Sequence, residues 1–133
     1  MRGANLIVAC WGGKRRLHTP AYEADRAYFA RQQAAHLERF RHSLAQVTFV
    51  VPEGGDPALG EYLSSLRKIR DARVAVLRRP NEGLSYGSWD HALRLTHRDF
   101  DHHLLLEDDY VFVEDGFDRT LAEWHDSLPD CGY

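Results

Sequence analysis

Four short apolar runs recur along the chain and alternate with longer segments whose apolar residues repeat with a helical period. The runs are nearly continuous and rich in leucine and β-branched residues, which is typical of parallel strands buried on both faces. They lie at residues 5–10, 47–51, 74–77 and 103–106. The amphipathic segments predict helices at about 21–44, 57–70, 85–95 and 116–127. Asp115 is placed to cap the last of these helices. This alternation predicts an α/β fold, a three-layer αβα Rossmann-like domain with a mostly parallel sheet.

Polar and glycine-rich loops follow all four predicted strands. In parallel sheets, ligands bind beyond the carboxyl ends of the strands, because loops and helix N-termini converge there. The loops read Trp11-Gly12-Gly13-Lys14, Glu53-Gly54-Gly55-Asp56, Asn81-Glu82-Gly83 and Glu107-Asp108-Asp109. We therefore expect one ligand site, built from four loops at one edge of the sheet.

The acids Glu107, Asp108 and Asp109 separate two apolar runs. Ionised carboxylates repel one another and are costly to desolvate, so a cation or hydrogen-bond donors should face them. Mg²⁺ and Mn²⁺ prefer carboxylate oxygens and often share them with substrate phosphates. The pattern favours a divalent metal site. A solvated turn or a group of helix-capping acids is the alternative for the trio taken alone.

The other loops also have two interpretations each. Asn81, Gly83 and Ser85 would let backbone amides at a helix N-terminus approach a phosphate or sugar, or they form an ordinary turn with Ser85 as the N-cap. Trp11 would stack on a nucleobase or pack partly buried. The basic residues 14–16 would meet a pyrophosphate or are solvated.

Composition narrows the class of protein. The 133 residues, 44% apolar and 28% charged, suit one domain spanning 1–133, and a net charge of -3 gives no overall attraction to nucleic acid. The apolar run at 5–10 is too short to cross a membrane, so we expect no transmembrane segment. Cys10 and Cys131 have neither metal-ligand nor disulfide spacing, which favours the cytoplasm. No histidine shows HExxH-like spacing, and no nucleophile arrangement is recognisable.

The order of these motifs resembles the donor-binding half of GT-A-type glycosyltransferases, most closely the family-two pattern. That pattern places an aromatic residue, acids, Asn-x-Gly-x-Ser and Asp-x-Asp after successive strands. The resemblance implies a GT-A fold, Mn²⁺ or Mg²⁺ as cofactor with Asp109 as the metal ligand, and hexosyl transfer in carbohydrate biosynthesis. The implied partners are a nucleoside diphosphate sugar, a UDP-sugar being favoured, and a saccharide or other hydroxyl acceptor. The residues implied to bind the nucleotide sugar are Trp11, Glu53, Asn81, Gly83, Ser85, Glu107 and Asp108.

Two features depart from the pattern. Pro52 replaces the first acid after the second strand, and Ser88-Trp89 stand where Arg-Asn is common. Members of this fold usually continue into an acceptor-binding half with the catalytic base. We therefore expect an apparently truncated domain with an unknown catalytic base, completed by a second chain or domain, and whether it is an enzyme stays open. The alternatives are a non-catalytic or truncated nucleotide-sugar-binding fragment and a sugar-phosphate nucleotidyltransferase, which residues 11–20 loosely resemble.

Overall fold

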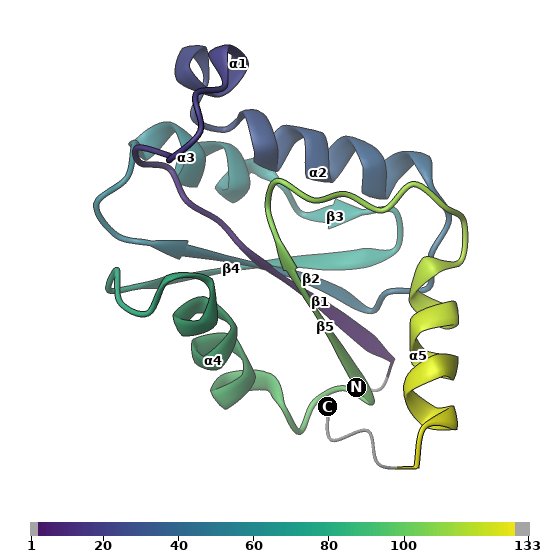
Figure 1. Ribbon diagram of the computed structural model, residues 1–133. Coiled ribbons are helices and arrows are strands. Elements are labelled where there is room, and N and C mark those ends of the chain that lie inside the picture. The colour runs from purple at the N-terminus through teal and green to yellow at the C-terminus, as the bar shows by residue number, and fades with distance from the viewer. Residues whose placement is uncertain (1–2, 130–133) are drawn as a thin grey trace.

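Five strands form one sheet at the centre of the computed structural model, which describes residues 3–129 (Figure 1). They are β1 (Ala4–Ala9), β2 (Gln46–Pro52), β3 (Lys68–Ile69), β4 (Ala72–Arg79) and β5 (His102–Glu107). The order across the sheet is β3-β4-β2-β1-β5. Every neighbouring pair is parallel except β3 and β4, which are antiparallel. The predicted α/β class and mostly parallel sheet are therefore confirmed, and the topology is compatible with a Rossmann-like fold.

Helices cover both faces of the sheet. They are α1 (Pro20–Ala24), α2 (Tyr28–Arg39), α3 (Pro57–Ser65), α4 (Leu84–Thr96) and α5 (Phe117–Ser127). Side chains from α2, α3 and α5 join the larger apolar cluster, and α4 packs with the smaller one on the other side. The alternation along β1 shows the two layers, because Leu6 and Val8 belong to the larger cluster and Ile7 belongs to the smaller one. None of the described helices is long and apolar enough to cross a membrane.

The strand order reverses between β1 and β5. From β1 the chain moves outward through β2 to β4, and it then returns to place β5 on the other side of β1. The carboxyl ends of the two strands are neighbours, since Ala9 pairs with Glu107. In open α/β sheets, ligands typically bind at such a reversal, beside the loops that follow the two strands.

Two predicted helices are wrong at their boundaries. The segment 21–44 forms α1 and α2, because Asp25 is extended and its carboxylate accepts a hydrogen bond from Ala27 N–H at 3.0 Å. The segment 57–70 is helical only to Ser65, and the short strand β3 follows. Arg70 adopts a left-handed φ of 54° in the turn after β3, and its Nε donates to Glu38 O at 2.8 Å. The first of these contacts is local and the second is tertiary, and a helical period registers neither.

Asp115 does not cap α5, in contrast to the prediction. The N-cap is Gly116, with a φ of 73° and no side-chain cap. The Asp115 carboxylate instead accepts hydrogen bonds from Arg41, from the backbone N–H at 2.7 Å and from Nη2 at 3.3 Å. The contact joins the start of α5 to the loop that follows α2.

Candidate functional site

The four predicted loops meet at the carboxyl edge of the sheet. Asp56 N–H donates to Gly12 O at 2.9 Å, which joins the loops after β2 and β1. Ser85 Oγ donates to Glu107 Oε1 at 2.8 Å, which joins the start of α4 to the end of β5. The parallel topology thus brings residues from distant parts of the sequence into one constellation.

Asp108 connects the loops that follow β1 and β5. Its Oδ2 accepts hydrogen bonds from Trp11 N–H at 3.2 Å and from Arg15 Nη2 at 2.6 Å. Asp108 is 3% exposed, so its ion pair with Arg15 is largely shielded from water. Burial raises the pKa of the Asp108 carboxyl above its ordinary value, and the hydrogen bond and charge of Arg15 offset only part of this effect. Asp108 therefore has a protein partner for its charge.

Two aromatic rings hold the guanidinium of Arg15 in place. Its Cζ lies 4.4 Å from the Tyr22 ring centroid and 4.5 Å from that of Phe29. The Tyr22 hydroxyl in turn donates to the carbonyl oxygens of Trp11 and Gly13. These contacts fix the loop after β1 against α1 and α2. The run of basic residues at 14–16 did not predict this packing of Arg15 between two aromatic rings.

Asp109 differs from its two acidic neighbours. Glu107 is bound by Ser85 and Asp108 by Arg15, whereas the exposed Asp109 carboxylate has no hydrogen bond or ion pair within residues 3–129. Its backbone is well held, because Tyr110 N–H donates to Glu107 O at 3.2 Å and the buried Gln33 Nε2 donates to Tyr110 O at 2.6 Å. One of the three acids is thus available to a cation at a fixed position.

The loop after β4 folds around a buried arginine. Arg79 is 4% exposed, and its guanidinium donates to Ser88 Oγ at 2.9 Å, Pro80 O at 2.6 Å and Leu84 O at 2.8 Å. These acceptors are neutral, and in the described part of the chain no carboxylate forms an ion pair with Arg79. A Cβ at Gly87 would lie 2.0 Å from Glu82 O, so the close turn requires glycine there.

Helix α4 begins without a side-chain cap. Gly83 is its N-cap in the left-handed region, with a φ of 75°, and Ser85 bonds Glu107 instead of capping the helix. The first amide groups of α4 and the charge of Arg79 thus lie in the same loop. Asn81 is exposed on this loop. A hollow of about 220 Å³ lies between this loop and α4, with Arg79, Gly87 and Arg94 among its lining residues.

Trp11 and Glu53 occupy the outer part of the edge. Trp11 is partly exposed, and its Nε1 donates to Lys14 O at 3.0 Å. The indole lies against Gly13, where a Cβ would be 2.1 Å from the ring. Glu53 is exposed, and its backbone N–H donates to Arg79 O at 2.8 Å. Both residues therefore reach the surface of the same edge.

A larger hollow of about 500 Å³ lies at the other end of the sheet. It is lined by residues of the loop after α2, the turn after β3 and the start of α5, including Arg41, Arg70 and Asp118. The Asp118 carboxylate accepts a hydrogen bond from Ser43 N–H at 2.8 Å, and Asp115 pairs with Arg41. These contacts join the surrounding segments, and none of the four predicted loops lines this hollow.

Comparisons of this chain with protein-family models, with curated proteins and with solved structures give no match. The geometry defines an α/β domain, compatible with a Rossmann-like fold, with polar loops gathered where the strand order reverses. The resemblance to GT-A glycosyltransferases consequently rests on the order of the motifs, and the function that follows from it is a proposal.

Proposed function

We propose that this domain binds a nucleoside diphosphate sugar at the carboxyl edge of its sheet and serves glycosyl transfer to an acceptor hydroxyl. The observation that carries the proposal is the free Asp109 carboxylate beside the point where the strand order reverses, on a turn whose backbone is held by Gln33. A UDP-sugar is the favoured donor because of the resemblance described above.

The three acids divide into two kinds in this proposal. The charge of Asp108 is balanced by Arg15, and Glu107 accepts a hydrogen bond from Ser85, so Asp109 is the ligand for Mg²⁺ or Mn²⁺. One carboxylate suffices, because these cations commonly complete their coordination with water and substrate phosphates. When bound, the cation supplies positive charge that stabilises a departing diphosphate. The oxygen chemistry of Asp109 fits a hard cation of this kind.

The loop after β4 supports binding of the phosphates. Within residues 3–129 the buried Arg79 guanidinium has only neutral acceptors, and α4 begins without a side-chain cap. Positive charge and uncapped amides at a helix N-terminus both favour an anion. Asn81, Gly83 and Ser85 keep their proposed roles at this loop, although Ser88-Trp89 replace the Arg-Asn of the family pattern. Arg79 supplies a positive charge that the resemblance of the motifs alone did not predict.

Trp11 and Glu53 are proposed to contact the nucleoside. Trp11 is partly exposed at the end of β1, where a base can stack on an aromatic ring. Glu53 follows β2, and its exposed carboxylate can accept hydrogen bonds from ribose or base. Glu107 and Asp108 are proposed to act mainly by holding the loops around the nucleotide. Transfer also needs a general base, which typically contributes about 10² to 10⁴-fold.

Calorimetric titration with UDP tests this proposal. We expect affinity to be at least about tenfold higher with Mn²⁺ than with a chelator, since a cation held by Asp109 would offset the negative charge of the diphosphate. Asp109→Asn should abolish that difference, whereas Asp71→Asn, a change at an exposed acid between β3 and β4, should preserve it. Equal affinity of the unaltered protein with Mn²⁺ and with chelator would contradict the proposal.

A further inference from the structure

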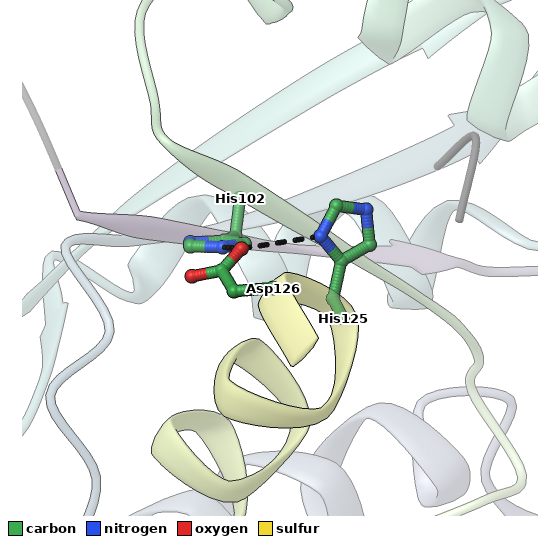
Figure 2. A group of neighbouring side chains, drawn as sticks. All are labelled: His102, His125 and Asp126. Carbon is green, nitrogen blue, oxygen red and sulfur yellow. Dashed lines mark hydrogen bonds and ion pairs between the residues drawn. The ribbon is translucent and has the colours of Figure 1, made fainter. Parts of the chain in front are cut away.

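Two histidines and an aspartate gather at the amino edge of the sheet. His102 is the first residue of β5, and His125 and Asp126 lie in the last turn of α5 (Figure 2). The cluster is at the opposite end of β5 from the acids proposed to serve the nucleotide. A rise of about 3.3 Å per residue separates the two ends of the strand by about 17 Å.

Both imidazoles converge on the same carboxylate oxygen. His102 Nε2 lies 2.9 Å from Asp126 Oδ1, and His125 Nδ1 lies 3.3 Å from it (Figure 2). The rings stand nearly perpendicular, with an interplanar angle of 87° and centroids 5.6 Å apart. One ligand atom from each residue lies within 4.8 Å of the other two. Three potential ligand atoms therefore already surround a small volume.

The two spacings to Asp126 Oδ1 are close to those of a tetrahedral metal site. Bonds of about 2.0 to 2.1 Å in tetrahedral geometry place ligand atoms about 3.4 Å apart. The distances of 2.9 and 3.3 Å to Asp126 Oδ1 differ from that value by about half an ångström or less. A cation can take the place of the protons that now lie between the rings and the carboxylate. Small side-chain movements are enough to admit it.

The chemistry of the cluster selects the class of cation. Two imidazole nitrogens and one carboxylate oxygen suit Zn²⁺ and related transition metals, whereas Mg²⁺ prefers an all-oxygen environment. The side chains of His102, His125 and Asp126 are 23%, 36% and 63% exposed, so water can reach the cluster and fill a fourth position. The cluster also lies at the C-terminal end of α5, where the helix dipole favours positive charge.

We propose that His102, His125 and Asp126 form a binding site for a zinc-type divalent cation that fastens the end of α5 to the start of β5. The site is independent of the proposed nucleotide site, because it lies at the other edge of the sheet and prefers another class of cation. A hydrogen-bonded clamp without a metal is the competing account of the same contacts. The two accounts differ in what the protein does when Zn²⁺ is added.

Calorimetric titration of metal-free protein with Zn²⁺ separates them. All proteins carry Cys131→Ser, so that this thiol cannot supply the signal. We expect one Zn²⁺ per chain, and a dissociation constant at least about tenfold higher in His102→Gln, His125→Gln and Asp126→Asn, since each removes one ligand. His18→Gln, which changes an exposed histidine on the loop after β1, is the matched control and should bind as the parent does. Mg²⁺ should produce no binding at this cluster.

Circular dichroism shows whether each variant is folded, and thermal unfolding shows whether Zn²⁺ stabilises it. Asp126→Asn retains an oxygen that can accept from both rings, so it should stay folded while losing affinity for Zn²⁺. Zn²⁺ should raise the melting temperature of the parent and of His18→Gln, and should leave that of His102→Gln nearly unchanged. Absence of Zn²⁺ binding by the parent, or parental affinity in folded Asp126→Asn, would overturn the proposal.

Discussion

Replacing Arg15 by methionine should destabilise the fold more than any other loss of a single ion pair described above. Arg15 is the one ion-pair partner of Asp108 within residues 3–129, at 2.6 Å, and the two side chains are only 16% and 4% exposed. Methionine keeps an apolar stem between Tyr22 and Phe29 but leaves the carboxylate buried without a cation. Among the described residues, the hydrogen bond that this carboxylate would keep is the one from Trp11 N–H at 3.2 Å.

The expected loss follows from the burial of the pair. Removing one partner of a buried ion pair typically costs about 3 to 5 kcal/mol. We expect about 3 kcal/mol at pH 7, the lower end, because Asp108 keeps one hydrogen bond and can take up a proton. Arg94→Met is the matched control: Arg94 pairs with Asp90 on the surface of α4, with exposures of 76% and 61%. Exposed pairs of this kind contribute little to stability, because water and salt screen them.

The loss should also depend on pH. Burial raises the pKa of Asp108 in the folded protein, and removing Arg15 raises it further. The folded state then binds the proton more tightly than the unfolded chain, in which the pKa of an aspartate is about 3.9. Stability from this group is therefore present at low pH and is lost as the pH rises through the raised pKa of the folded state. The deficit of Arg15→Met should be smaller at pH 5 than at pH 7.

Urea unfolding followed by tryptophan fluorescence at both pH values measures these free energies. The reasoning predicts a loss for Arg15→Met that is clearly larger than that for Arg94→Met and that shrinks on acidification. A loss equal to the control, or one that grows from pH 7 to pH 5, would refute it.

Two further predictions concern residues near the carboxyl edge of the sheet. Gly87→Ala should lower the free energy of unfolding by about 1 to 3 kcal/mol, since its Cβ would meet Glu82 O at 2.0 Å. Gly60→Ala should cost much less in the same urea assay, because the atoms nearest to its Cβ would belong to the movable Arg78 guanidinium. Cys10 is 3% exposed, and burial raises the pKa of its thiol, so in a Cys131→Ser variant it should react with a disulfide reagent only after urea is added. Rapid reaction of the folded variant would show that Cys10 is accessible.

The four parallel strands could be predicted because both faces of the sheet are covered, whereas the short strand β3 was not predicted. Residues of β1 and β2 are buried throughout, so their sequences are almost continuously apolar. Helix boundaries were less predictable, since they depend on distant partners. The turn at Arg70, for example, is held by the backbone of Glu38 at the end of α2. A local period cannot register that contact.

The meeting of the four loops could be predicted from the parallel topology alone. Which of the three acids would be paired within the protein could not. Whether Asp108 or Asp109 is free depends on where Arg15 points, and that is decided by Tyr22 and Phe29. His102, His125 and Asp126 escaped detection for a similar reason. They share no motif spacing, and only the packing of α5 beside β5 brings them together.

Paramagnetic broadening by Mn²⁺ in the presence of UDP tests the central proposal most directly, because it locates the cation. With isotope-labelled protein, the account predicts selective loss of backbone amide signals at the carboxyl edge, in residues 11–14, 83–85 and 109–110. Signals of His125 and Asp126, at the opposite edge, should persist. Asp109→Asn should restore the lost signals. Broadening centred on His125 and Asp126, or unchanged signals around Asp109, would contradict the account.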